Sequence, residues 1–176
     1  MRTSTILLTL FSLAAAAISA HAQASPPADT TVTIAGKTIT IKYSAPSVRG
    51  RKIFGADGLL KNDPTYPVWR AGANNATSFE TTGNLAFGTL NVPAGKYTLY
   101  VLPEANAWKL IINKQTGQWG TDYDQKQDLG RVAMTTSKTP ALVEKFKITL
   151  ASAGANKGKL TLEWENTSAS VDFTVK

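Results

Sequence analysis

The arginines of this chain gather where its β-strand pattern breaks. Most of its 19 basic residues are lysines spread along the sequence, but Arg49, Arg51 and Arg70 fall in two neighbouring irregular motifs, RGR and WRAGAN. Arginine presents a rigid planar fork that suits bidentate contacts to carboxylate or phosphate groups. Gly50 and Gly72 beside them would let the backbone turn or approach other groups closely. This pattern predicts a cluster at one end of the domain that binds an anion.

The same arginines have a purely structural interpretation. Acidic residues that could pair with them are Asp57, Asp63 and Glu80, and such pairs would fasten a long loop to the domain. Truncating a loop-pinning arginine would strand its buried partner and lower stability, whereas truncating a binding arginine would lower affinity. The sequence leaves both possibilities open.

Aromatic and amide side chains extend the candidate site. Trp69 and Trp119 lie beside glycine-containing loops, where an indole can stack on a sugar ring or plug the end of the fold. The alternation of apolar residues instead places Trp108 and Trp164 in the core. The predicted ligand-binding residues are Arg49, Arg51, Trp69, Arg70, Asn74 and Trp119.

The carboxylates offer weaker signals. Glu163 and Glu165 stand two apart on an expected strand, so both should face solvent at a spacing of about 6.5–7 Å between Cα atoms, which overlaps the spacing of glycosidase carboxylates. Asp122, Asp124 and Asp128 could ligate calcium from a loop, but their spacing fails the EF-hand pattern because Lys126 takes a ligand position. A solvent-facing strand explains the two glutamates more simply, and turn or cap roles explain the three aspartates more simply.

Missing residue types exclude whole classes of chemistry. The chain has no Cys, and its one His, His21, falls in the expected targeting segment. After removal of that segment neither Ser-His-Asp nor Cys-His catalysis, thiol redox chemistry, haem attachment or a His/Cys zinc site is available. We therefore predict no catalytic residue, no metal site and no cofactor.

The N-terminus is typical of a secretory signal peptide. A basic start is followed by the apolar stretch 6–20 and then by Ala20-His21-Ala22, which fits an A-x-A cleavage signal. The stretch is too short to span a membrane, which takes about 20 apolar residues. We expect cleavage between Ala22 and Gln23, a flexible leader over 23–30, and a periplasmic or secreted protein without a transmembrane anchor.

The elements that must position the site are β-strands. Apolar residues alternate with polar ones in short segments from residue 31 onward, and no useful helical period follows the signal peptide. Clean alternation indicates antiparallel sheets with one buried face. We predict one domain over 31–176, an all-β antiparallel sandwich of about nine or ten strands, with a barrel as the alternative. Segment 44–67 interrupts the alternation as a long loop, and long loops are often functional.

Six ordered motifs resemble a known family. They cover nearly the whole chain after the leader and read YSAPSVRGRKIFG (43–55), VWRAGANNAT (68–77), VPAGKYTLYVLP (92–103), INKQTGQWG (112–120), YDQKQDLGRV (123–132) and LTLEWENT (160–167). This succession is similar to that of the bacterial secreted family catalogued as domain of unknown function 2911. The resemblance implies an exported, single-domain, β-rich protein. It implies no activity and transfers no functional residue.

The net charge of +7 raises the question of partners. Export argues against nucleic acid, and many lysines occupy outward strand positions where charge keeps sheet edges soluble. We predict a non-catalytic binding or envelope-associated module for an anionic or glycan ligand, such as an anionic polysaccharide or another envelope component. The alternatives are a structural or interaction protein of the envelope, and a carboxylate- or metal-dependent enzyme acting on glycans.

Overall fold

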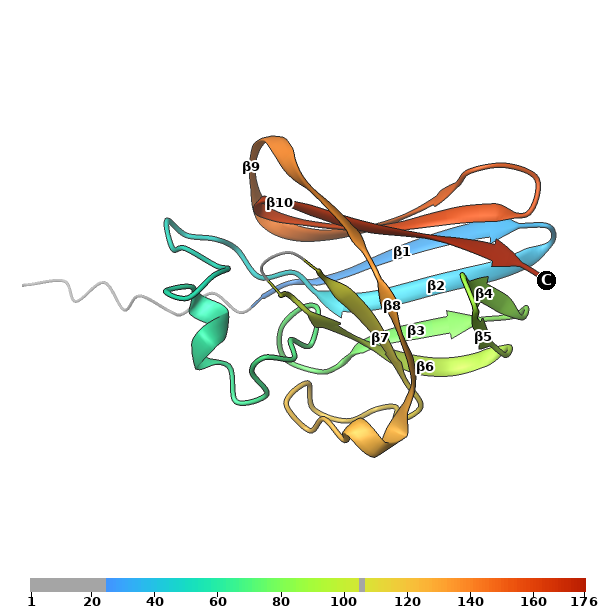
Figure 1. Ribbon diagram of the computed structural model, residues 1–176, viewed down its shortest axis with the longest axis horizontal. Coiled ribbons are helices and arrows are strands. Elements are labelled where there is room, and N and C mark those ends of the chain that lie inside the picture. Colours follow the sequence, from blue (N-terminus) through green and yellow to red (C-terminus); the bar gives the residue numbers. More distant parts are fainter. Residues whose placement is uncertain (1–24, 105–106) are drawn as a thin grey trace, which may run out of the picture.

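Two antiparallel sheets face each other in the computed structural model, which describes residues 25–104 and 107–176 (Figure 1). The predicted all-β sandwich is confirmed: ten strands are present among these residues, and the two sheets do not close into a barrel. The only helical elements described are two short 3-10 turns, η1 (Leu59–Asn62) and η2 (Gln125–Gln127).

The larger sheet has six strands and carries most of the polar loops. In spatial order they are β1 (Pro27–Ile34), β2 (Lys37–Ser44), β3 (Thr77–Thr81), β6 (Gly95–Leu102), β7 (Lys109–Asn113) and β8 (Asp128–Ala133). Every neighbouring pair is antiparallel. The strands β2 and β3 are neighbours in the sheet, although the long segment 45–76 separates them in the sequence. This inserted segment leaves the sheet after β2 and returns to it at β3, and it lies at the left end of the molecule in Figure 1.

The smaller sheet contains two unusually long strands. Its order is β5 (Leu90–Val92), β4 (Leu85–Phe87), β10 (Lys157–Val175) and β9 (Thr135–Ser152). The sequence predicts short separate strands here, but β9 and β10 each run on through the predicted gaps. Their pairing shifts register around Glu165, whose φ of 57° marks an irregularity in β10. A bulge of this kind lets a long pair bend without ending.

Part of the predicted flexible leader is a β-strand. Residues 27–30, expected to be flexible, form the first half of β1, where Pro27 lies opposite Ser44 and Thr30 opposite Ile41. A strand is not predicted here because these residues are mostly polar. An edge strand such as β1 can be polar, since its alternate residues remain exposed. The predicted signal peptide, residues 1–22, and its cleavage site lie outside the described residues.

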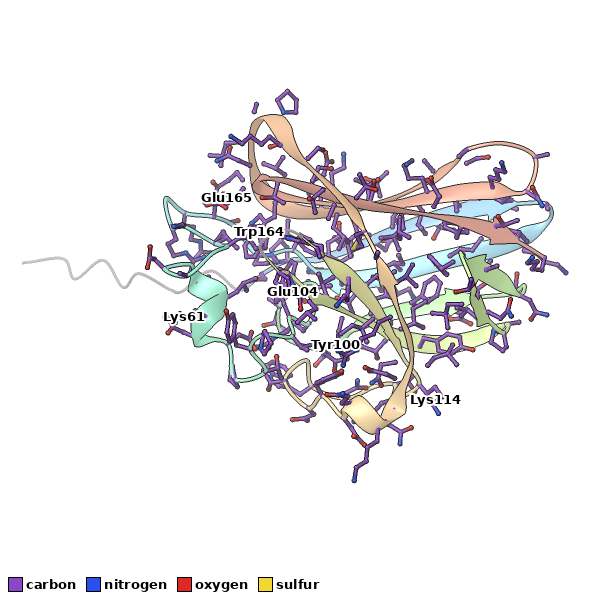
Figure 2. All side chains as sticks on the ribbon, in the orientation of Figure 1. Lys61, Tyr100, Glu104, Lys114, Trp164 and Glu165 are labelled. Carbon is purple, nitrogen blue, oxygen red and sulfur yellow. The ribbon has the colours of Figure 1, made fainter. Side chains whose placement is uncertain are left out.

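Aromatic rings fill the core between the sheets at the end where the inserted segment lies. Trp69 stacks on Trp164 with ring centroids 5.4 Å apart and planes 17° apart, and Phe146 and Phe54 meet this pair edge-on. The predicted burial of Trp108 and Trp164 is confirmed. Figure 2 shows Trp164 at the same end of the molecule as Lys61 of η1. Segment 45–76 therefore contributes Phe54 and Trp69 to the core and is packed against it.

No helix within residues 25–104 and 107–176 has the length and apolar character needed to cross a membrane.

Candidate functional site

The first part of the inserted segment is fastened to the edge of β9. Val48 N donates to Glu144 O at 2.8 Å, and Phe146 N donates to Pro46 O at 2.8 Å. The Glu144 carboxylate also accepts the Arg49 N–H at 2.8 Å. These bonds extend the sheet by a short stretch and fix the place where the chain turns back.

That turn presents two arginines. Arg49 and Gly50 have φ values of 51° and 67°, so both central residues of the turn adopt the left-handed conformation. Glycine tolerates this conformation without strain, which is the role the sequence suggests for Gly50. Arg51 then folds back and donates from Nε to Val48 O at 3.0 Å and from Nη2 to Ser47 O at 2.7 Å. Its guanidinium is oriented by carbonyl oxygens and forms no ion pair with the described residues.

Arg70 is held very differently. Its Nη2 lies 2.9 Å from Asp63 Oδ2, and only 13% and 12% of the two side chains are exposed. Asp63 also accepts hydrogen bonds from the backbone N–H and the hydroxyl of Thr65 at 3.0 and 2.8 Å. Burial tends to raise the pKa of Asp63, but the bonds from Thr65 and the Arg70 charge outweigh it and lower that pKa. For Arg70 the loop-pinning interpretation is therefore the one observed, whereas Asp57 and Glu80 pair with lysines.

Trp69 belongs to the core. It is 2% exposed, its backbone bridges Val101 of β6, and its Nε1 donates to Gly72 O at 3.2 Å. Gly72 passes so close to β2 that a Cβ there would lie 3.0 Å from Ser44 O, the close approach that the sequence suggests. Behind Trp69, Trp164 is equally buried, and its Nε1 has no hydrogen-bond partner among the described residues.

Trp119 is the exposed tryptophan of the predicted site, with 49% of the residue accessible to solvent. Its loop is joined to the inserted segment by Gly120 N, which donates to Asn74 O at 3.0 Å, and by Ala76 N, which donates to Gln118 O at 3.2 Å. A Cβ on Gly120 would lie 2.4 Å from Arg70 Cδ and 2.7 Å from Asn74 O. Only glycine at this position lets the loop pack against Arg70.

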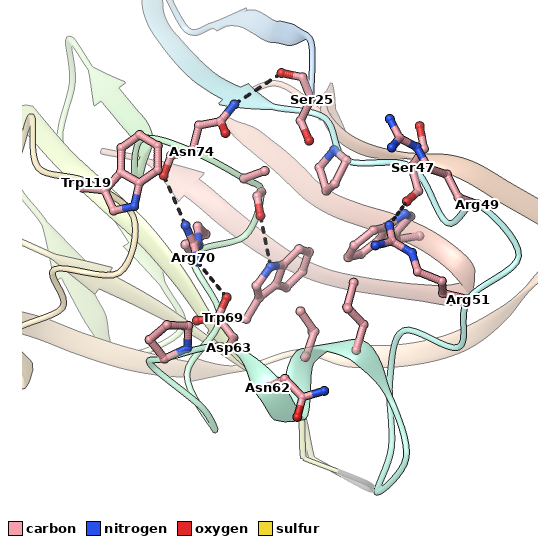
Figure 3. Close-up of a pocket in the computed structure, with 17 residues that line it drawn as sticks. Ser25, Ser47, Arg49, Arg51, Asn62, Asp63, Trp69, Arg70, Asn74 and Trp119 are labelled. Atoms are coloured by element: carbon pink, nitrogen blue, oxygen red, sulfur yellow. Dashed lines mark hydrogen bonds and ion pairs between the residues drawn. The ribbon is translucent and has the colours of Figure 1, made fainter. Parts of the chain in front are cut away.

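These side chains enclose one cavity of about 450 Å³. Figure 3 shows Arg49 and Arg51 on one side and Trp119, Arg70 and Asn74 on the other, above the η1 turn. All six residues predicted to bind a ligand line it, so the structure brings the predicted cluster together at one end of the sandwich. Ligand binding by them stays a prediction.

Several lining residues escaped the sequence analysis as site residues. They include Ser25, Ser47 and Asn62, which add hydroxyl and amide groups, and Asp63, foreseen only as a pairing partner. Isolated serines and asparagines in a polar loop carry no pattern of their own. Charge balance is the one available signal, since Asp63 is the nearest acidic residue to WRAGAN on its N-terminal side.

Comparison with known families settles what kind of domain forms this cavity. The profile of the family described as a protein of unknown function, DUF2911, matches residues 25–173. The chain belongs to the DUF2911 family. The match spans both sheets and the inserted segment, in agreement with the resemblance found in the sequence. The chain has no significant match among curated proteins or among solved structures.

A second polar cluster of this DUF2911 domain is structural. Asp128 accepts from Tyr123 Oη at 2.8 Å, from Asn113 Nδ2 at 2.9 Å and from the Arg131 guanidinium at 2.9 and 3.0 Å. Burial, reinforced by the Asp128 carboxylate, raises the pKa of Tyr123 to about 12. Asp124 accepts from Lys126 N at the start of η2. Asp124 thus has one of the turn and cap roles that the sequence suggests, whereas the Asp128 carboxylate joins the side chains of Tyr123, Asn113 and Arg131. No group of three or more metal-ligating side chains occurs in the described part of the chain.

The paired glutamates of the DUF2911 domain do not form a free wet face. Glu163 follows the expected alternation, but Glu165 sits at the irregularity in β10 and its carboxylate accepts the Ile53 N–H at 3.2 Å. The expectation that both carboxylates simply face solvent is wrong for Glu165, because the inserted segment covers this part of the strand. Glu165 anchors that segment from the β10 side.

Proposed function

We propose that this protein is a non-catalytic binding module that takes an acidic saccharide, a sugar carrying a carboxylate, in the Arg49–Arg70–Trp119 cavity. One observation carries the proposal. Three guanidinium groups and an exposed indole line a single cavity in which the lining carboxylate, Asp63, is already paired with Arg70. The proposed place of action is the periplasm or the cell exterior, as the N-terminal sequence predicts.

The charge of the cavity favours an anion. The lining carboxylate, Asp63, is paired with Arg70, and that pair is internally neutral. Arg51 remains as a cation whose bonds go only to the carbonyls of Ser47 and Val48. Hydrogen bonds between a guanidinium and a carboxylate are shorter and stronger than neutral ones, so an incoming carboxylate has a defined partner here.

The remaining lining groups favour a sugar over a bare anion. The exposed ring of Trp119 offers a flat apolar surface to the C–H face of a sugar ring. Ser25, Ser47, Asn62 and Asn74 supply hydroxyl and amide groups that can pair with sugar hydroxyls. The volume of about 450 Å³ falls within the range of small-molecule sites.

Calorimetric titration with four probes tests the proposal. Digalacturonate should bind, whereas its methyl ester lacks the charge, acetate lacks the ring, and digalactose lacks the carboxylate, so each of these three should bind weakly or not at all. Arg51→Gln should lower the affinity for digalacturonate about tenfold, since a charge-assisted hydrogen bond contributes about 1.5 kcal/mol or more. The matched control is Lys37→Gln, which removes the same charge from the exposed first residue of β2, at the far end of the domain, and should leave the affinity unchanged.

Tryptophan fluorescence gives an independent readout of where the ligand lies. Trp119 is exposed, whereas the other three tryptophans are buried. Digalacturonate should protect the emission from acrylamide quenching, and Trp119→Phe should abolish that protection. Failure of digalacturonate to bind, or binding that Arg51→Gln leaves intact, would overturn the proposal.

A further inference from the structure

A second cavity lies on the other side of the η1 turn. It has a volume of about 830 Å³ and is bounded by η1 and by the bend of the β9–β10 pair. Leu60 of η1 lines both cavities, so the two adjoin at this turn. Asn62 lines the first cavity and the adjacent Lys61 lines the second, and both residues are exposed (Figure 2 for Lys61).

The second cavity repeats the chemistry of the first. Tyr66, 52% exposed, stands at its edge as Trp119 stands at the edge of the first. Among the described residues three large hydrophobic side chains are exposed, and these two aromatic ones each line one of the two neighbouring cavities; the third is Leu142. Exposed aromatic rings thus concentrate on the two cavities instead of scattering over the surface.

The charge of the second cavity is also positive. Lys61 and Lys138 line it, and neither forms an ion pair within the described residues. The lining carboxylate, Glu104, lies 3.6 Å from Lys109 Nζ and is offset by that lysine. Ser137, Asn166 and Thr167 add groups able to pair with sugar hydroxyls.

We infer that the two cavities are subsites of one extended site for an acidic polysaccharide, whose chain crosses the η1 turn between Trp119 and Tyr66. This inference rests on the proposed function of the first cavity and specifies its ligand as a polymer. A polymer suits the arrangement because successive sugars repeat the same carboxylate and ring, which is what two similar basic, aromatic-edged subsites would select.

Chain length is the variable that separates this site from a single-sugar pocket. Once one part of a chain is bound, the next part reaches the second cavity as an intramolecular event at high effective concentration. Affinity should therefore rise with the length of the oligogalacturonate until one chain fills both cavities. Further lengthening should then change the affinity little. Digalacturonate is too short to bridge the two cavities, so its affinity for the first cavity should not depend on the second.

The test compares short and long oligogalacturonates on variants of the second cavity. Tyr66→Ala and Lys138→Gln should each lower the affinity for long oligomers about tenfold and leave that for digalacturonate unchanged. Lys37→Gln is the matched control for charge, and thermal unfolding checks that Tyr66→Ala, a truncation of an exposed ring, retains the fold.

The outcomes distinguish this inference from the proposed function. If digalacturonate binds but longer oligomers bind no tighter, or if Tyr66→Ala and Lys138→Gln leave the tighter binding intact, the extended site is wrong and the first cavity stands. If no oligogalacturonate of any length binds, both are wrong.

Discussion

At the scale of single residues, the three clustered arginines have divided roles. Arg70 is committed to Asp63 in a mostly buried pair, whereas Arg51 is exposed and is oriented by two carbonyl oxygens. The two interpretations that the sequence leaves open are therefore not exclusive. Arg70 holds the loop in place, whereas Arg51, on the other side of the cavity, supplies the charge of the proposed binding site. Mutations of the two residues should separate stability from binding.

Arg70→Ala should destabilise the fold. The substitution leaves Asp63 buried without its cation and with only Thr65 as a partner, which should cost about 3 kcal/mol of the free energy of unfolding. Urea unfolding at neutral pH measures it. Arg51→Ala is the control and should cost less than about 1 kcal/mol, since no carboxylate loses a partner. Equal losses in the two variants would contradict the division of roles.

The Asp63 carboxylate should also make stability depend on pH. Its pKa in the folded protein lies below the ordinary value of 3.8, so the unfolded chain binds the proton more readily. The stabilisation is then fully present above that ordinary value and is lost as the pH falls through the folded pKa. Urea unfolding from neutral pH down to about pH 3 should show a steeper acid loss in the wild type than in Asp63→Asn. Parallel curves would show that Asp63 is not ionised and paired as described.

At the scale of elements, the site depends on loops that dock on one another. The segment 45–76 is fastened to β9 through Val48 and to β10 through Glu165, and the Trp119 loop is in turn fastened to that segment. Periodicity identifies segment 44–67 as an interruption and places two arginines in it. It cannot show which strands receive the segment, because those contacts join residues about a hundred positions apart.

Gly120→Ala should separate the Trp119 loop from Arg70. The new Cβ would collide with the Arg70 side chain and with the Asn74 carbonyl, so the loop must move away. We expect a loss of about 1–3 kcal/mol in stability, as for overpacking, together with weaker digalacturonate binding. Gly117→Ala in the same loop is the control: its Cβ meets nothing, and only its φ of 80° adds strain. Binding that survives Gly120→Ala at full strength would remove Trp119 from the site.

At the scale of the whole molecule, the two sheets meet along β1–β2 and the edge of β9. Tyr43 Oη accepts the Ile148 N–H at 3.0 Å, and Thr30 Oγ1 accepts the Leu150 N–H at 3.3 Å. These bonds occupy donors that an edge strand would otherwise leave open to another chain. Alternation places Tyr43 on the inward face with Ile39 and Ile41, which is confirmed by its packing against Phe146. Its hydroxyl partner was beyond prediction, because pairing between sheets depends on how they twist and approach.

Tyr43→Phe should loosen this seam without disturbing the core. The ring keeps its edge-on contact with Phe146, at 5.5 Å between centroids, while the Ile148 amide loses its acceptor. The free energy of unfolding should fall by about 1–3 kcal/mol, the cost of leaving one partly buried donor unpaired. Native-state hydrogen exchange should show faster exchange at Ile148 but not at Phe146, whose N–H is held by Pro46 O. Tyr66→Phe, which removes a hydroxyl that bonds to no described residue, is the control and should change neither quantity. Unaltered exchange at Ile148 in Tyr43→Phe would mean that the Tyr43 hydroxyl does not protect the Ile148 amide.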